Sequence, residues 1–380
     1  MKRALSRREF MCRCALCGLG AAFAPAWLRS AAAAGEGAAR RIPVSELKEA
    51  MFWQPEAGGL VRCLTCPNEC RREEGAVTTC RTRINRGGRL YTLTYGKPCV
   101  VFADPLEKNP LYHVAPGSEA IGVATAGCNL RCLYCQNWNF SQSGPWETKN
   151  MDLSPEALVQ RVKDRKMKWM TFSYTEPVAY YEYALDAAKA AKRAGVKTAV
   201  VTAGYIHPKP LEELIANCDA FSVTLKGYTD DFYKRIVGCP LNKVWETITA
   251  LDRAKRWVEV VTLVVPTLND EESGLRALAR SLAKLNKDIP LHFLRFSPAW
   301  KLANLPPTPV PTLERAQAIA REEGLRFVYL ANLPGHQGAN TVCPSCKTLL
   351  VERVGFKVLR NGIQAGRCPS CRAVIPGVDL

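Results

Sequence analysis

Residues 121–135 read Ile-Gly-Val-Ala-Thr-Ala-Gly-Cys-Asn-Leu-Arg-Cys-Leu-Tyr-Cys. The apolar run Ile121–Ala126 has the length and composition of a buried β-strand. Cys128, Cys132 and Cys135 follow it on one loop, with the spacing C-x3-C-x2-C. A structural zinc site or an ordinary cubane cluster takes four protein ligands, so three thiols indicate a 4Fe-4S cluster with one iron open. The alternative is a zinc knuckle whose fourth ligand comes from a distant part of the sequence.

Strand and helix patterns alternate beyond this loop. Further apolar runs fall at Trp169–Tyr174, Thr198–Thr202, Ala220–Leu225, Val258–Val264, Leu291–Phe296 and Arg326–Leu330. Helical periodicity is found at Pro155–Arg165, Pro177–Ala194, Pro208–Asn217, Pro240–Arg256 and Glu271–Asn286. This alternation predicts an α/β fold with parallel strands, which is a complete or partial (β/α) barrel or an open doubly wound sheet. In both folds functional groups lie at the C-terminal ends of the strands.

Composition places the chain among folded globular proteins. Of its 380 residues, 47% are hydrophobic and 23% charged, which excludes collagen, coiled coil and wholesale disorder. Its 52 basic residues outnumber 35 acidic ones, and the excess persists without residues 1–34. A basic surface suits nucleic acid, an anionic substrate or an acidic protein partner, but no motif supports a nucleic-acid groove.

The N-terminal residues 1–34 have the order of a signal peptide. Ser6-Arg7-Arg8-Glu9-Phe10-Met11 precedes an uncharged stretch from Cys14 to Leu28 and then a run of alanines. The paired arginines resemble a twin-arginine (Tat) signal, which implies export to the periplasm or cell envelope. The alternative is a cytoplasmic protein with an amphipathic N-terminal helix or a wrong start codon. The apolar stretch is too short for a permanent anchor, so no membrane span is expected in the mature chain.

The cysteine spacing at 128–135 resembles that of the radical S-adenosylmethionine (SAM) superfamily. The resemblance implies that the open iron chelates SAM and that reductive cleavage yields a 5'-deoxyadenosyl radical, which attacks a substrate. Tyr174-Thr175-Glu176-Pro177 resembles the superfamily's Gly-Gly-Glu-Pro motif, so Glu176 is expected to bind the SAM ammonium group. Because Tyr174 and Thr175 replace the glycines, their contacts with SAM are expected to differ. Tyr134 stands where the superfamily places an aromatic ring against adenine.

Each of these assignments has a structural alternative. Glu176 could complement the dipole of a helix that begins at Pro177. Tyr134 could be core packing.

A narrower resemblance covers the chain from about Cys63 to the C-terminus. It is to the radical SAM enzyme of the AmmeMemoRadiSam system, a relative of the pyruvate formate-lyase activating enzymes. The segments that carry it are Asp104-Pro-Leu-Glu-Lys-Asn-Pro-Leu-Tyr-His113, Cys135-Gln-Asn-Trp138, Ser141-Gln142, Ser222-Val-Thr-Leu-Lys226, Glu259 to Asp270 and His292-Phe-Leu-Arg-Phe-Ser-Pro298. The chain departs from that family at Thr224, where Asp is usual, and at Ala203, where Asn is usual.

Three charged or titratable residues in these segments have alternative roles. Lys226 is either a cation of the SAM site or a solvated strand end. His292, with Arg295, either faces the substrate or is a core histidine, and the second is favoured. His113 is interpreted as structural.

Two further cysteine groups flank the α/β region. Cys343, Cys346, Cys368 and Cys371 form two C-x2-C pairs and predict a zinc ribbon, with a rubredoxin-like iron site as the alternative. Cys63, Cys66, Cys70 and Cys80 are four more ligands within 18 residues. Their spacing does not name the metal: zinc is slightly favoured over an auxiliary iron-sulfur cluster.

These patterns give one domain plan and two hypotheses on function. The plan is a signal at 1–34, a Cys-rich module at 35–116, a radical SAM partial TIM-like barrel at 117–335 and a zinc ribbon at 336–380. The favoured function is that of a radical SAM enzyme with an unknown substrate. Within this class it could be a glycyl-radical activase or an AmmeMemoRadiSam enzyme that acts with partner proteins. It would need a low-potential electron donor. The alternative is an exported, non-catalytic iron-sulfur or electron-transfer protein.

Overall fold

The computed structural model describes residues 37, 39 and 41–380, and residues 44–380 form one compact unit. The predicted signal at 1–34 lies outside the described residues. In the part that the structure describes, no helix is both long and apolar enough to cross a membrane.

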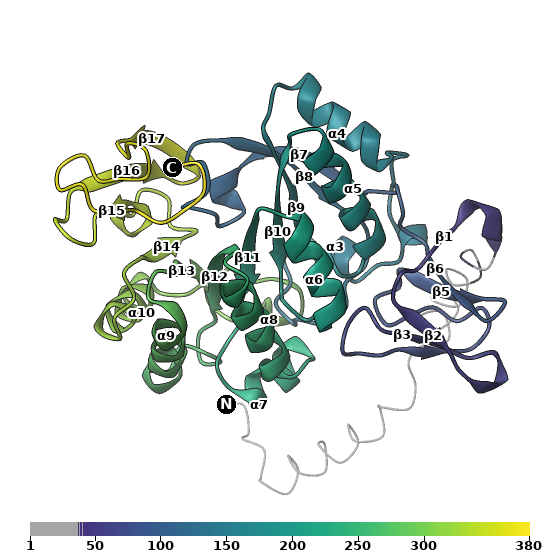
Figure 1. Cartoon of the computed structure of the whole chain (residues 1–380). Helices are drawn as coiled ribbons and strands as arrows, with labels where there is room; N and C mark the ends of the chain where they lie inside the picture. The colour runs from purple at the N-terminus through teal and green to yellow at the C-terminus, as the bar shows by residue number, and fades with distance from the viewer. Residues whose placement is uncertain (1–36, 38, 40) are drawn as a thin grey trace, which may run out of the picture. The chain divides into compact units, whose positions relative to one another are not determined.

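An eight-stranded sheet forms the centre of this unit (Figure 1). Its order is β14-β13-β12-β11-β10-β9-β8-β7, and within the described chain no strand joins β14 to β7. Strands β8 to β14 are parallel, whereas β7 lies antiparallel to β8 at the edge. Their bounds are β7 Val100–Pro105, β8 Glu119–Ala124, β9 Trp169–Phe172, β10 Lys197–Thr202, β11 Ala220–Thr224, β12 Trp257–Val264, β13 Leu291–Arg295 and β14 Val328–Ala331. The predicted α/β fold with parallel strands is confirmed.

Amphipathic helices connect the strands and cover one face of the sheet. They are α3 Trp138–Ser141, α4 Pro155–Asp164, α5 Tyr181–Arg193, α6 Pro208–Asn217, α7 Asp230–Phe232, α8 Leu241–Arg253, α9 Glu272–Asn286 and α10 Val310–Glu322. Helix α4 begins where its sequence predicts: Pro155 is the first residue, and the Ser154 hydroxyl accepts a 3.1 Å hydrogen bond from Ala157 N. The sequence analysis did not predict β7 or α10.

Short helical segments complete the connections. They are η2 Val44–Glu46, η3 Ala57–Gly59, η4 Leu106–Lys108, η5 Pro145–Glu147, the π-helix η6 Tyr233–Val237, η7 Trp300–Leu302 and η8 Gln337–Ala339. The π-helix is notable because such turns are often found at functional sites.

The two faces of the sheet differ in polarity. On β8 and β9, Ile121, Val123, Met170 and Phe172 belong to the main hydrophobic core with residues of α4 and α5. The alternate residues point to the other face, where Gly122 pairs with Thr171 in the register of the two strands. Because the strands are parallel, their C-terminal ends all meet at one edge of the sheet, where the candidate site lies.

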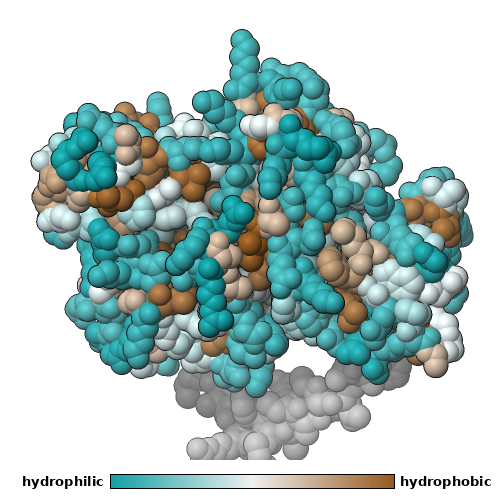
Figure 2. All heavy atoms as spheres, in the orientation of Figure 1, coloured by the Kyte–Doolittle hydropathy of each residue, from teal (hydrophilic) through white to brown (hydrophobic). Residues whose placement is uncertain are grey.

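Three small antiparallel sheets flank the central one. The sheets β1-β6-β5 and β2-β3-β4 precede it, and β15-β16-β17 follows it. Their bounds are β1 Lys48–Glu49, β2 Trp53–Pro55, β3 Val61–Cys63, β4 Arg71–Arg72, β5 Arg83–Arg86, β6 Arg89–Thr92, β15 Thr341–Val342, β16 Leu349–Val354 and β17 Lys357–Asn361. Figure 2 shows hydrophobic side chains gathered over β15–β17, and Val354, Phe356 and Leu359 are among the exposed ones there.

Candidate active site

The loop Gly127–Cys135 begins just after β8 and lies at the C-terminal edge of the parallel sheet. Two backbone hydrogen bonds attach it to η6: Arg131 N donates to Val237 O, and Leu133 N donates to Ile236 O, each at 3.0 Å. The loop therefore has a fixed path between β8 and the π-helix.

The three thiols of this loop are shielded from solvent. Cys132 is buried, and Cys128 and Cys135 are half-buried. Burial raises the pKa of the Cys128 thiol well above its ordinary value, and the charge of Glu176 adds to the shift. Burial also raises the pKa of Cys132, although the charge of Lys226 opposes it. Thiols of this kind lose their protons when a metal binds them.

Glu176 is buried after β9, and its carboxylate reaches the end of β10. Thr202 Oγ1 donates to Glu176 Oε1 at 2.5 Å, and Ala203 N donates to Oε2 at 2.7 Å. Burial raises the pKa of Glu176, while these hydrogen bonds and the charge of Lys226 oppose the rise. The carboxylate is therefore held in one orientation, as a charge-assisted acceptor requires.

Tyr174 and Thr175 direct their side chains to protein groups. The Tyr174 hydroxyl donates to the carboxylate of Asp104 on β7, and its ring occupies the space where Gly122 lacks a Cβ. Tyr174 also has a φ of +65°, a conformation that glycine adopts more easily. The Thr175 hydroxyl donates to Thr125 O at 2.9 Å.

Lys226 and Tyr134 lie together beside the cysteine loop. The Lys226 ammonium is 5.9 Å from the centroid of the Tyr134 ring. Burial lowers the pKa of Lys226, but the charges of Cys132, Tyr233, Cys135 and Cys128 outweigh this and raise it. Lys226 is thus placed against the three-cysteine loop. The buried Tyr134 hydroxyl has no hydrogen-bond partner among the described residues.

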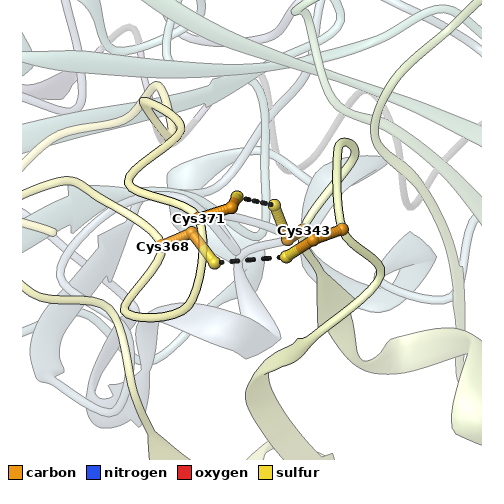
Figure 3. Close-up of side chains that lie close together, drawn as sticks. Cys343, Cys368 and Cys371 are labelled. Atoms are coloured by element: carbon orange, nitrogen blue, oxygen red, sulfur yellow. Dashed lines mark hydrogen bonds between the residues drawn. The ribbon is translucent and has the colours of Figure 1, made fainter.

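The C-terminal thiols converge on one point (Figure 3). Cys343 Sγ lies 3.6 Å from Cys371 Sγ, and Cys346 Sγ lies 3.6 Å from Cys368 Sγ. The four sulfur atoms all lie within 4.8 Å of one another. Four sulfurs bound to one zinc ion at 2.3 Å would be about 3.8 Å apart, so the residues fit a single metal ion.

The N-terminal thiols are buried beside a small sheet. Cys63 ends β3, Cys70 precedes β4, and Cys63 N donates to Cys70 O at 3.0 Å. Cys66 and Cys80 are buried as well.

His113 and His292 lie away from the cysteine loop, and His292 stands near the N-terminal end of β13. His292, the second residue of β13, is fully buried, and its Nε2 is 2.7 Å from Glu259 Oε2. His113 N donates to Glu259 Oε1 at 2.8 Å, and the His113 ring bonds to Tyr329 and Pro376 O. Arg295 donates from Nε to Thr308 O at 2.9 Å. Both histidines belong to a buried polar network with Glu259, in which His292 Nδ1 has no hydrogen-bond partner among the described residues.

Sequence reasoning missed several residues that shape the site. Thr202 positions Glu176, and Arg131 bonds from inside the cysteine loop to the N-terminal module. Asn129 donates from Nδ2 to Tyr205 O at 2.8 Å and so attaches the loop to the segment after β10. Thr202 could have been found from its position at the end of a strand. Nothing in the sequence singled out Arg131 and Asn129 except their position between the cysteine ligands.

Comparison with known proteins identifies the class. Residues 123–278 match the family model of the radical SAM superfamily. The chain is 40% identical over 328 residues to an uncharacterised protein of Methanocaldococcus jannaschii. The alignment covers 86% of this chain and 98% of that protein. It is 30% identical over 181 residues to the pyruvate formate-lyase-activating enzyme of Clostridium pasteurianum, over 45% of this chain and 71% of that enzyme. A radical SAM methyltransferase structure from Sphaerobacter thermophilus aligns over 86% of this chain and 85% of that one, with 15% identity and a TM-score of 0.45.

The chain belongs to the radical SAM superfamily, and it is an enzyme with homologues among the activating enzymes. Membership implies a 4Fe-4S cluster and SAM as cofactors. This confirms the predicted superfamily and favours the enzyme over the non-catalytic hypothesis.

Proposed function

We propose that the protein cleaves SAM reductively at a 4Fe-4S cluster bound by Cys128, Cys132 and Cys135. When bound, the cluster and SAM together supply a 5'-deoxyadenosyl radical that abstracts hydrogen from a substrate. The observation that carries the proposal is the three-thiol loop at the strand ends, with Lys226 and the fixed carboxylate of Glu176 beside it.

The residues present fit these cofactors. The three cysteines offer three sulfur ligands and leave one iron open. Glu176 has two oxygens oriented by Thr202 and Ala203, and its carboxylate is suited to accept a hydrogen bond from the cationic amine of SAM. The buried Tyr134 hydroxyl needs a partner, which a bound nucleoside can offer. Lys226 offsets the negative charge that three thiolates bring to a buried site.

We propose an activase-like or AmmeMemoRadiSam-type reaction on a protein or other substrate held beside this loop. The support is the similarity to a pyruvate formate-lyase-activating enzyme and the sequence segments from Asp104 to Pro298 that resemble the AmmeMemoRadiSam enzyme. A low-potential electron donor and a partner protein belong to this proposal.

The test is anaerobic loading of the full chain with iron and sulfide, followed by dithionite and SAM. Wild-type protein is expected to form 5'-deoxyadenosine and methionine. Cys132→Ala is expected to abolish both products, whereas Cys218→Ala, a buried cysteine at the end of α6, is expected to retain them. The proposal fails if loaded protein forms no 5'-deoxyadenosine while a reference radical SAM enzyme forms it in parallel.

For the C-terminal group we propose zinc. The support is the 3.6 Å separation within each sulfur pair, close to that around one tetrahedral ion. Metal analysis of purified protein is expected to give one zinc per chain, and Cys343→Ser with Cys368→Ser is expected to remove it. Iron in place of zinc would favour the rubredoxin-like alternative.

Export through a twin-arginine route remains our proposal for localisation. Its support is the order of charged, apolar and small residues in 1–34. Residues 1–40 fused to a reporter that fluoresces only after folded export should carry it out of the cytoplasm. Arg7→Lys with Arg8→Lys should retain it inside.

A further inference from the structure

The N-terminal cysteine module packs directly against the radical SAM loop. Asn68 donates from Nδ2 to Asn129 O at 2.8 Å, which joins the two cysteine segments. A Cβ on Gly127 would lie 2.4 Å from Cys80 O, so the backbone of one cysteine segment touches the other. Cys66 is buried in the same hydrophobic cluster as Cys132 and Tyr134. The two sets of thiols therefore belong to one packed region.

Arg131 connects the two sets. It lies between Cys128 and Cys132 in the sequence, and its guanidinium donates to Thr79 O, next to Cys80. The same guanidinium donates to Gln142 Oε1 at 3.0 Å. Its charge interacts with Cys128 of the radical SAM loop and with Cys80 and Cys70 of the N-terminal group. One half-buried cation therefore interacts with both groups of sulfur atoms.

The N-terminal thiols have the surroundings of a metal centre rather than of isolated buried cysteines. All four are buried, and three lie within hydrogen-bond distance of a threonine hydroxyl. Cys80 Sγ has two such partners, Thr78 at 3.1 Å and Thr82 at 3.0 Å. Arg83, itself buried, places Nη1 4.0 Å from Cys80 Sγ. Hydrogen bonds and charges at the sulfurs are what set the potential of an iron-sulfur cluster.

Sulfur spacing distinguishes the three cysteine groups. Among residues 37, 39 and 41–380, the C-terminal four are the set whose sulfurs all lie within 4.8 Å. That is single-ion spacing, because one ion sits between its ligands. The radical SAM cysteines, which hold a cubane in this superfamily, do not gather so closely, and neither do Cys63, Cys66, Cys70 and Cys80. The N-terminal group therefore does not have the single-ion spacing of the C-terminal group.

We propose that Cys63, Cys66, Cys70 and Cys80 hold a second 4Fe-4S cluster that carries electrons to the radical SAM loop. This replaces the slight preference for zinc in the sequence analysis, and the cluster's role rests on the proposed function. One electron arrives from a reduced low-potential carrier protein and is passed on at the neighbouring loop. No bond forms or breaks in this transfer. Arg131 is a positioning residue between the two centres.

Metal content tests the proposal directly. A full-length variant with Cys128, Cys132 and Cys135 all changed to Ala is loaded anaerobically with iron and sulfide. About four irons and four sulfides per chain, with about one zinc, are expected, together with an EPR signal after dithionite. A second variant that also carries Cys343→Ser and Cys368→Ser should lose the zinc and keep the iron. Two zincs and no iron in the first variant would overturn the inference. If that result is obtained and the wild-type protein still cleaves SAM, the proposed function stands and only the second cluster is ruled out.

Arg131 has a separate test in potentiometric EPR titrations. Arg131→Gln removes a positive charge beside both clusters, so both midpoint potentials are expected to shift to more negative values. Arg253→Gln, on the exposed end of α8, is the matched control and should leave both unchanged. A shift at one cluster alone, or at neither, would show that Arg131 does not link the two centres.

Discussion

The Thr202 hydroxyl, at the end of β10, donates a 2.5 Å hydrogen bond to Oε1 of Glu176, which follows β9. Two adjacent parallel strands thus supply one carboxylate and the group that orients it. Thr202→Val is expected to weaken SAM binding about tenfold or more, because a hydrogen bond to a charged group contributes about 1.5–3 kcal/mol. Isothermal titration with SAM measures this. Thr202→Ser keeps the hydroxyl and should bind SAM nearly as well as wild type; equal losses in both variants would contradict the assigned role.

Arg83 on β5 and Glu182 on α5 form a fully buried ion pair at 2.8 Å. Arg83→Met leaves an unpaired buried carboxylate and is expected to lower the free energy of unfolding by about 3–5 kcal/mol. Arg89→Met breaks an exposed pair with Glu49 in the same module and should have a much smaller effect, because solvent screens exposed ion pairs. Anaerobic denaturant titrations compare them, and similar losses would show that Arg83 does not hold the module to α5.

Gly127 has a φ of +92°, and a Cβ there would lie 2.4 Å from both Cys80 O and Thr82 Cγ2. Gly127→Ala is expected to destabilise the chain by about 1–3 kcal/mol through overlap alone and to reduce the iron bound per chain. Gly195→Ala introduces a similar backbone strain at φ +71° with no atom within 4 Å. Denaturation and iron analysis separate the two effects. If the control variant loses as much iron, contact with Cys80 is not the cause.

Burial lowers the pKa of His113 to about 4, despite the opposing charge of Glu259. The unfolded chain, with an ordinary pKa of about 6.5, therefore binds more protons than the folded chain between these values. His113 contributes stability above pH 6.5 that is lost as pH falls towards 4, about 3 kcal/mol in all. Denaturant titrations between pH 7 and 4 should show a smaller pH dependence for His113→Phe than for wild type. An unchanged profile in His113→Phe would rule the effect out.

Much of the fold could be predicted because periodicity is local. The strands β8–β14 and helices α4, α5, α6, α8 and α9 fall where apolar runs and 3.6-residue patterns place them. Helix α10 was missed although Leu313, Ala316 and Ile319 carry the pattern and are buried. Strand β7 was missed because Asp104 and Pro105 weaken its strand signal, and pairing with β8 stabilises it instead.

The amino-acid order alone determined the superfamily, since three ligands on one loop and the acid before Pro177 are local features. It could not determine which groups face those ligands. Three contacts depend on segments that are distant in the sequence. Lys226 lies against the cysteines, Thr202 donates to Glu176, and Arg131 lies between two sets of thiols. The core role of His292 also depends on the tertiary structure. Alternation along a strand predicts the face on which a side chain lies but not the residue that it contacts. Sulfur-to-sulfur distances, which separate a single-ion site from a cluster site, exist only once the loops are folded together.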